Sequence, residues 1–204
     1  MLDVAVVVGS TRPGRRGRVV ADWVLDGLAQ HPAAQPAGPL SLHLVDLADF
    51  DLPLLDEPLP AMFGQYQGER TRAWADVVDG LDAFVFVTPE YNHSLPAALK
   101  NAIDLLWAEW NDKAAGFVSY GVHGGTRAVE HLRQVLAEVK VAGVRSQVAL
   151  SMFDDFAITD PTEAGGFTPR AHQSVLLAEM LDELVAWAGA LQALREGAAA
   201  PVTA

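Results

Sequence analysis

Five short runs of apolar residues recur along the chain, and between them apolar residues return every three or four positions. A continuous apolar run of about four to eight residues is typical of a strand buried on both faces, whereas the wider spacing is typical of an amphipathic helix. The pattern predicts strands over residues 4–8, 40–47, 83–87, 114–120 and 144–150. It predicts helices over residues 19–30, 69–80, 97–107, 126–140 and 169–195.

Strands that alternate with helices predict an α/β fold, with a parallel five-stranded sheet covered by helices on both faces. We expect one domain over residues 1–196 and a flexible Ala/Gly/Pro tail over residues 197–204. A proline-rich linker at residues 32–39 and a long loop at residues 49–68 interrupt the pattern. With strand order 2-1-3-4-5, the loops after strands one, three and four line one crevice at the carboxyl edge of the sheet, where such folds bind ligands.

Composition removes several classes of function. The formal net charge of -12 argues against nucleic acid as a partner. The absence of cysteine excludes disulfides, thiolate metal ligands and a cysteine nucleophile, and the histidines do not have the spacing of a metal site, so we predict no metal. No apolar stretch is long enough to span a bilayer and no signal peptide is recognisable, so we expect a cytoplasmic protein without a membrane partner.

The loop after the first strand concentrates positive charge, with four of the fourteen basic residues between positions 12 and 18. A Gly/Ser/Arg loop that leads from a strand into a helix is typical of an anion site, because the first N–H groups of the helix lack partners. There is no P-loop lysine and no G-x-G-x-x-G motif, which favours a terminal monophosphate. The alternative is an ordinary turn with solvated arginines. The candidate phosphate ligands are Ser10, Arg12, Gly14, Arg15, Gly17 and Arg18.

Two further loops offer the walls of a site for a flat heteroaromatic ring. The first follows the third strand and contains Pro89, Glu90, Tyr91 and Asn92. The second follows the fourth strand and contains Ser119, Tyr120, Gly121, Gly124 and Gly125. Each is also compatible with a plain turn between a strand and a helix. We find no catalytic dyad, and the roles of Arg16, His93 and His123 stay open.

Four motifs together resemble the NADPH-dependent FMN reductases, flavodoxin-like proteins related to quinone, chromate and azo-dye reductases. The resemblance runs from about residue 3 to residue 150. It rests on G-S-T-R-P-G-R at residues 9–15, T-P-E-Y-N at 88–92, L-P-A-A-L-K-N-A-I-D at 95–104, and S-Y-G at 119–121 with G-G-T-R at 124–127.

The resemblance implies a flavodoxin-like three-layer fold that binds FMN. Ser10, Arg12 and the backbone of residues 14–18 would hold the phosphate, and the second and third loops would flank the isoalloxazine ring. One further loop arginine would be available for the 2′-phosphate of NADPH. NADPH or NADH would give hydride to flavin N5, after which a quinone, free flavin or other small acceptor would be reduced in a ping-pong cycle.

Two alternatives share the implied fold: a flavodoxin-type electron carrier, and a regulatory or partner-binding module that has lost the cofactor. The last predicted helix is apolar around more of its circumference than one core face needs, and the region of Trp107 and Trp110 is similarly apolar. Excess apolar surface favours a subunit interface, and members of the family are commonly dimers or tetramers. We therefore expect a homodimer or homotetramer, although a well-covered helix of one domain would show the same stripe.

Overall fold

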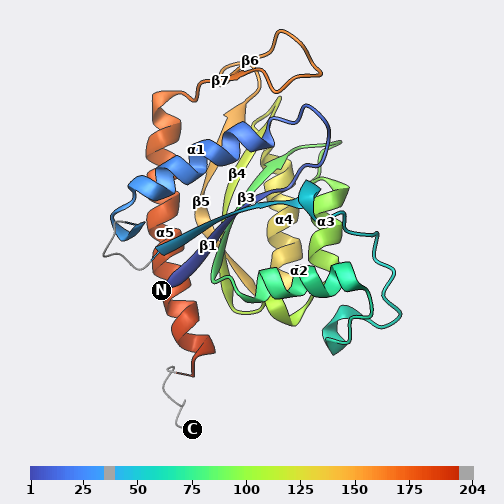
Figure 1. Ribbon diagram of the computed structural model, residues 1–204. Coiled ribbons are helices and arrows are strands. Elements are labelled where there is room, and N and C mark those ends of the chain that lie inside the picture. Colours follow the sequence, from blue (N-terminus) through green and yellow to red (C-terminus); the bar gives the residue numbers. More distant parts are fainter. Residues whose placement is uncertain (35–39, 198–204) are drawn as a thin grey trace.

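The computed structural model describes residues 1–34 and 40–197. The end of the predicted linker and residues 198–204 of the predicted tail lie outside the described residues. Five parallel strands form the central sheet in the order β2-β1-β3-β4-β5 (Figure 1), which confirms the expected fold class. They are β1 (Leu2–Val8), β2 (Leu40–Asp46), β3 (Ala83–Pro89), β4 (Lys113–Gly121) and β5 (Val141–Ser151).

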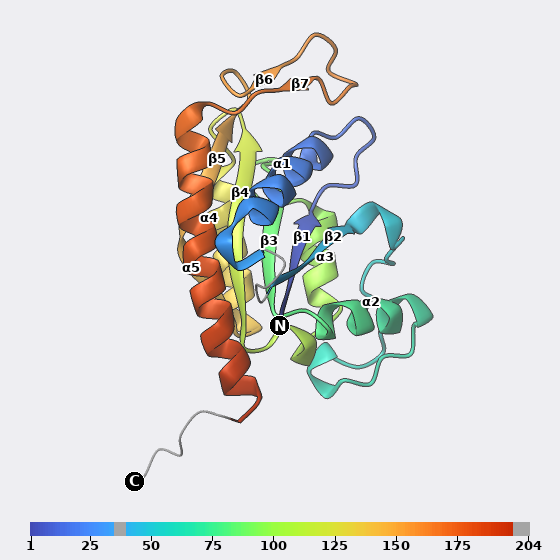
Figure 2. The same ribbon diagram turned by 60° about the vertical axis from the view of Figure 1, so that its left-hand side comes forward.

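Two helical layers enclose this sheet (Figures 1 and 2). One layer contains α1 (Gly17–Gln30) and α5 (Ala171–Arg195). The other contains α2 (Glu69–Asp79), α3 (Ala97–Asp104) and α4 (Thr126–Glu138). Short 3-10 turns occur at Pro32–Ala34, Leu47–Asp49, Ala61–Phe63 and Ala108–Trp110.

Alternate residues of each central strand enter opposite layers, because successive side chains of a strand point to opposite faces. In β1, Val6 packs toward α1 and α5, and Val7 packs toward α2 and α3. This explains why the strands read as unbroken apolar runs. Trp110 is 1% exposed and lies in the second layer, where its ring centroid is 5.0 Å from that of Phe84. Trp110 is therefore core, and our inclusion of it in an excess apolar surface was wrong.

Several element boundaries differ from the prediction. α1 begins at Gly17, two residues before the predicted start, because Arg16 already has helical angles at the N-cap. α3 ends at Asp104 because Trp107, with φ -134° and ψ -69°, leaves the helical region before the next turn. β5 begins at Val141, three residues before the predicted start. Its pairing register with β4 shifts between Gly143 and Gln147, so buried and exposed positions do not alternate regularly in this part of the strand.

A short antiparallel hairpin between β5 and α5 was not predicted. Its strands, β6 (Phe156–Ala157) and β7 (Gly166–Phe167), have two residues each, which is too short to give a periodic signal. The buried Asp155 carboxylate fixes the base of the hairpin by accepting the backbone N–H groups of Ser151 and Arg170, at 2.7 and 3.0 Å. We call residues 152–170 the hairpin segment; it lies beyond the carboxyl edge of the sheet (Figure 2).

Candidate functional site

The carboxyl ends of β1, β3 and β4 meet around a cavity of about 240 Å³. All three loops that were expected to share a crevice contribute to its lining. The hairpin segment adds one residue. The lining consists of Arg12, Arg15, Arg16, Pro89, Glu90, Tyr91, Tyr120, Gly121, Val122 and Met152.

Two hydroxyl groups lie beside the start of α1. The fully buried Ser10 shares a hydrogen bond with the Tyr120 phenol, with 3.2 Å between the oxygens. A Cβ at Gly17 would lie 2.9 Å from Ser10 Oγ and 3.1 Å from the Tyr120 oxygen, so only glycine leaves room here. Burial raises the pKa of Tyr120 above its ordinary value, and the phenol therefore remains a neutral hydrogen-bond donor.

Two arginines of the first loop are turned toward protein partners. Arg12 Nη2 donates to the backbone oxygen of Pro161 in the hairpin segment, at 3.3 Å. Arg15 Nη2 forms an ion pair with the buried Asp46 carboxylate at the end of β2, at 2.5 Å. Both guanidinium groups thus line the cavity while bonded elsewhere.

The other two arginines differ sharply in environment. Arg18 lies on α1, where its Nε contacts the exposed Asp22 at 2.9 Å, and it does not line the cavity. Arg16 lines the cavity and is only 7% exposed. Within the described residues its Nε and Nη2 atoms have no hydrogen-bond partner and it forms no ion pair. A buried guanidinium without a partner lowers the stability of the fold, so an anion bound beside Arg16 would be stabilising.

The second loop is held by an ion pair. The Glu90 carboxylate accepts from Arg127 Nε at 2.8 Å and from the Arg127 backbone N–H at 3.2 Å. The Glu90 backbone N–H donates to the Tyr120 carbonyl at 3.2 Å, which joins the second loop to the third. Glu90 is therefore a structural carboxylate rather than a free base.

The tip of this loop turns away from the cavity. Tyr91 and Ser94 exchange backbone hydrogen bonds, and Asn92 and His93 between them adopt positive φ values of 50° and 68°. His93 Nε2 accepts from Arg127 Nη1 at 2.9 Å. Of the predicted quartet, Pro89, Glu90 and Tyr91 line the cavity and Asn92 does not.

Apart from Tyr120 and Val122, which line the cavity, the third loop contributes backbone rather than side chains. The buried Ser119 hydroxyl donates to the Gly124 carbonyl at 2.7 Å, within the loop itself. Gly124 and Gly125 have φ values of 73° and 71°, a region that favours glycine, and Gly125 caps α4. Gly121 lines the cavity, whereas Ser119, Gly124 and Gly125 shape the turn behind it.

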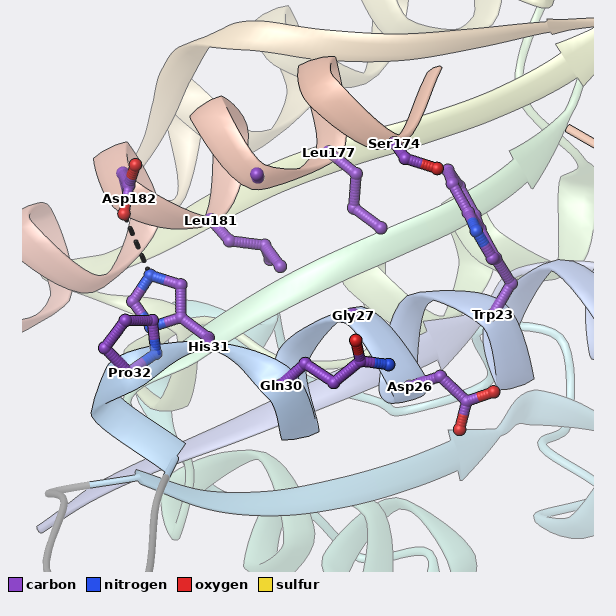
Figure 3. A pocket seen from close by; sticks show the side chains of 11 residues that line it. Trp23, Asp26, Gly27, Gln30, His31, Pro32, Ser174, Leu177, Leu181 and Asp182 are labelled. Atoms are coloured by element: carbon purple, nitrogen blue, oxygen red, sulfur yellow. Dashed lines mark hydrogen bonds and ion pairs between the residues drawn. The ribbon is translucent and has the colours of Figure 1, made fainter. Parts of the chain in front are cut away.

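A second cavity of about 450 Å³ lies between α1 and α5, on the flank of the sheet (Figure 3). Leu177 and Leu181 form its apolar floor, and His31 bonds Asp182 across one end at 2.9 Å. None of its lining residues has a buried, unpartnered polar side-chain atom in the described part of the chain. The smaller cavity at the carboxyl edge is therefore the stronger candidate for a charged ligand.

Residues 2–155 match the family model described as NADPH-dependent FMN reductase. The chain belongs to the NADPH-dependent FMN reductase family. It is 39% identical over 146 residues to the NAD(P)H-dependent FMN reductase LOT6 of Saccharomyces cerevisiae, covering 69% of this chain and 76% of the relative. It is 36% identical over 143 residues to a quinone reductase of Escherichia coli, covering 66% and 69%.

Solved structures agree with the fold. The flavoenzyme NAD(P)H:(acceptor) oxidoreductase FerB of Paracoccus denitrificans has a TM-score of 0.64 and 24% identity, and the comparison covers 93% of this chain and 98% of that one. As a member of the FMN reductase family, this chain is an oxidoreductase. No described helix has both the length and the apolar character needed to cross a membrane.

The cavity of this FMN reductase family member fits a flavin phosphate on its own geometry. The orphaned guanidinium, the two hydroxyls and the unpartnered N–H groups at the start of α1 are donors suited to an anion. Sequence reasoning named Arg12, Arg15 and Arg18 as phosphate ligands and left the role of Arg16 open, because the burial and partners of each arginine depend on the fold. It also missed Val122 and Met152, which have no distinguishing pattern.

Proposed function

We propose that this chain binds FMN in the carboxyl-edge cavity and uses it to oxidise NAD(P)H and reduce a small acceptor such as a quinone or free flavin. The observation that carries the proposal is the meeting of three loops around buried donors that have no partner among the described residues. Names of relatives support the redox partners, since they include both FMN reductases and quinone reductases.

The chain's own contribution is to bind and orient. The donors at the start of α1 would hold the phosphate, and Pro89, Tyr91 and Gly121 line the same cavity. Bound FMN would supply the hydride chemistry, as flavins do in general. Glu90, the one carboxylate among the described lining residues, is held by Arg127, so the chain is not organised for side-chain proton transfer. We propose a ping-pong order because the acceptor and the nicotinamide would use the same open cavity.

We further propose that two copies of the chain associate. Five large apolar side chains within residues 54–63 are at least 40% exposed, and two of them, Leu55 and Met62, line an apolar cavity of about 490 Å³ beside α3. Exposed apolar patches of this kind mark association surfaces. Light scattering should give a dimer mass or a multiple of it, and Met62→Glu with Phe63→Glu should shift it toward the monomer. A wild-type monomer at micromolar concentration would contradict this part.

The decisive test is an absorption scan of the purified protein followed by oxidation assays with NADH and NADPH. The acceptor panel should contain quinones, free flavins and an azo dye, with added FMN in every reaction. We expect a flavin spectrum, direct NAD(P)H oxidation and parallel double-reciprocal plots. An electron carrier would bind FMN but lack rapid NAD(P)H oxidation. A colourless protein that gains no activity with added FMN would overturn the proposal.

A further inference from the structure

The cavity between α1 and α5 has an apolar floor that belongs to the packed core (Figure 3). Leu177 and Leu181 form this floor and are only 3% and 1% exposed. A Cβ at Gly27 would lie 2.7 Å from Leu177 Cδ2, so the glycine allows α1 to lie close against the floor. The volume of about 450 Å³ is in the range that small organic ligands occupy.

Trp23 gives the same cavity an aromatic wall. Figure 3 shows its ring at one end of the cavity and His31 at the other. The indole is partly buried and packs edge-on against Phe167, with 5.7 Å between the ring centroids. Among aromatic side chains, the face of an indole attracts cations most strongly. This wall therefore suits both an apolar body and a positive charge.

Two carboxylates make the lining of this cavity negative. Asp26 comes from α1 and Asp182 from α5, and both are exposed. Within the described residues the Asp26 carboxylate has no ion pair, whereas its neighbour Asp22 on α1 is paired with Arg18. The described lining contains neither lysine nor arginine. No cation of the lining therefore balances Asp26.

His31 does not neutralise the second carboxylate. Its Nδ1 accepts the backbone N–H of Ala33 at 3.2 Å, so this nitrogen has no proton. The ring proton then lies on Nε2, which donates to Asp182 at 2.9 Å, and the imidazole is neutral. Asp182 therefore keeps its negative charge, as Asp26 does.

These features select one class of ligand. Two carboxylates repel an anion. An inorganic cation would lack ligands, because no group of three or more His, Asp or Glu side chains among the described residues is placed to hold a metal ion. A neutral apolar molecule would use the floor and the wall but leave the charge unmatched. An organic cation with a flat apolar body uses all three.

We propose that the cavity between α1 and α5 binds an aromatic ammonium ion, with its ring on the apolar floor beside Trp23 and its ammonium group attracted by Asp26 and Asp182. This cavity shares no lining residue with the carboxyl-edge cavity. The inference is therefore independent of the proposed function, and a protein that binds no flavin would leave it untouched.

The test compares three indoles of similar size and different charge: tryptamine, a cation; tryptophol, in which a hydroxyl replaces the ammonium group; and indole-3-propionate, an anion. Each is titrated into full-length ¹⁵N-labelled protein, and the indole N–H signals of the tryptophans are followed by NMR. Trp23→Phe identifies the Trp23 signal by its loss. The Trp74 and Trp110 indoles donate to the Ala102 and Ile103 carbonyls in the core, so their signals report whether a variant is folded.

Tryptamine should shift the Trp23 signal with a dissociation constant on the order of 1 mM or lower, a value in keeping with a ligand of its size. Tryptophol should bind about fivefold more weakly or worse, because it makes no ionic contact. Indole-3-propionate should leave the signal unchanged. Sodium chloride at about 0.5 M should weaken the binding of tryptamine and not that of tryptophol.

Charge-removing variants locate the ammonium group. Asp26→Asn with Asp182→Asn should weaken tryptamine binding about tenfold and change tryptophol binding less than about twofold. The new amide oxygen in Asp182→Asn can still accept from His31, so the shape of the cavity is retained. Glu179→Gln is the matched control, since it removes one negative charge from α5 outside the cavity. It should leave the affinity for tryptamine within about twofold of wild type.

Three results overturn the inference. One is a Trp23 signal that none of the three indoles shifts. Another is equal affinity for tryptamine and tryptophol that the double variant leaves unchanged, which would make the cavity an apolar groove without charge selection. The third is a Trp23 signal that moves when the protein alone is diluted, which would show that a second copy of the chain occupies the groove.

Discussion

Gly17→Ala is the smallest change that should damage the phosphate end of the cavity. The added Cβ would lie 2.9 Å from Ser10 Oγ, 3.0 Å from Val8 Cγ1 and 3.1 Å from the Tyr120 oxygen. Carbon atoms do not approach buried oxygens this closely without displacement. Val8 belongs to the rigid end of β1, so the two hydroxyls must give way.

The expected size of the effect follows from the donors that move. A hydrogen bond to a charged group contributes about 1.5–3 kcal/mol. Losing one such bond to the phosphate corresponds to a dissociation constant for FMN that is about 10- to 100-fold higher. Riboflavin lacks the phosphate, so its affinity should change far less. Overpacking should also lower the free energy of unfolding by about 1–3 kcal/mol.

The assay is fluorescence titration of flavin-free protein, paired with urea denaturation. Gly189→Ala is the control, because it is also a helical Gly→Ala change and its Cβ would have no atom within 4 Å. It should leave both flavin affinities unchanged and stabilise the protein by up to about 1 kcal/mol. An FMN affinity of Gly17→Ala within twofold of wild type would refute the reasoning that the two hydroxyls bind the phosphate.

Three further changes test other parts of the structure. Burial lowers the pKa of Lys113 to about 8, so the unfolded chain holds this proton more tightly than the folded chain does. The free energy of unfolding should therefore rise by about 2 kcal/mol between pH 7 and 9.5. Urea denaturation should show this rise for the wild type and not for Lys113→Met. Glu90→Gln should reduce stability by about 1–2 kcal/mol and weaken binding of both flavins, because it breaks the ion pair with Arg127; equal affinities would contradict a bracing role. Asp155→Asn should cost about 2–4 kcal/mol and expose the hairpin segment to chymotrypsin, since the buried carboxylate accepts two backbone N–H groups.

The sheet could be predicted because its strands are buried on both faces. A continuous apolar run such as residues 83–87 is best accommodated in a strand that is buried on both faces. The alternation of such strands with amphipathic helices then restricts the possible topologies. The first and last residues of the helices and strands were harder to predict from the sequence. The end of α3 depends on how Trp107 and Trp110 enter the second layer, which is a tertiary effect. The hairpin segment escaped prediction because two-residue strands have no periodicity.

The three loops of the site were recognisable because glycine, proline and turn formers interrupt the apolar pattern at the same edge of the sheet. The sequence did not show which side chains of these loops face the cavity. Ser119 and Asn92 have the right chemistry, but Ser119 bonds its own loop and Asn92 lies at a turn with positive φ. The orientation of these side chains depends on the hydrogen-bond partners that the fold brings to them, and a single sequence does not identify those partners.

The arginines of the first loop show why pairing decides function in an acidic chain. With a net charge of -12, carboxylates are abundant and a cation usually finds one nearby. Asp22 and Asp46 neutralise Arg18 and Arg15 in this way. A buried arginine that has no carboxylate partner among the described residues is then informative, because the chain contains many carboxylates. Among the described residues Arg16 has no ion pair at the N-cap of α1, which is costly for a buried guanidinium, and a bound anion would offset that cost.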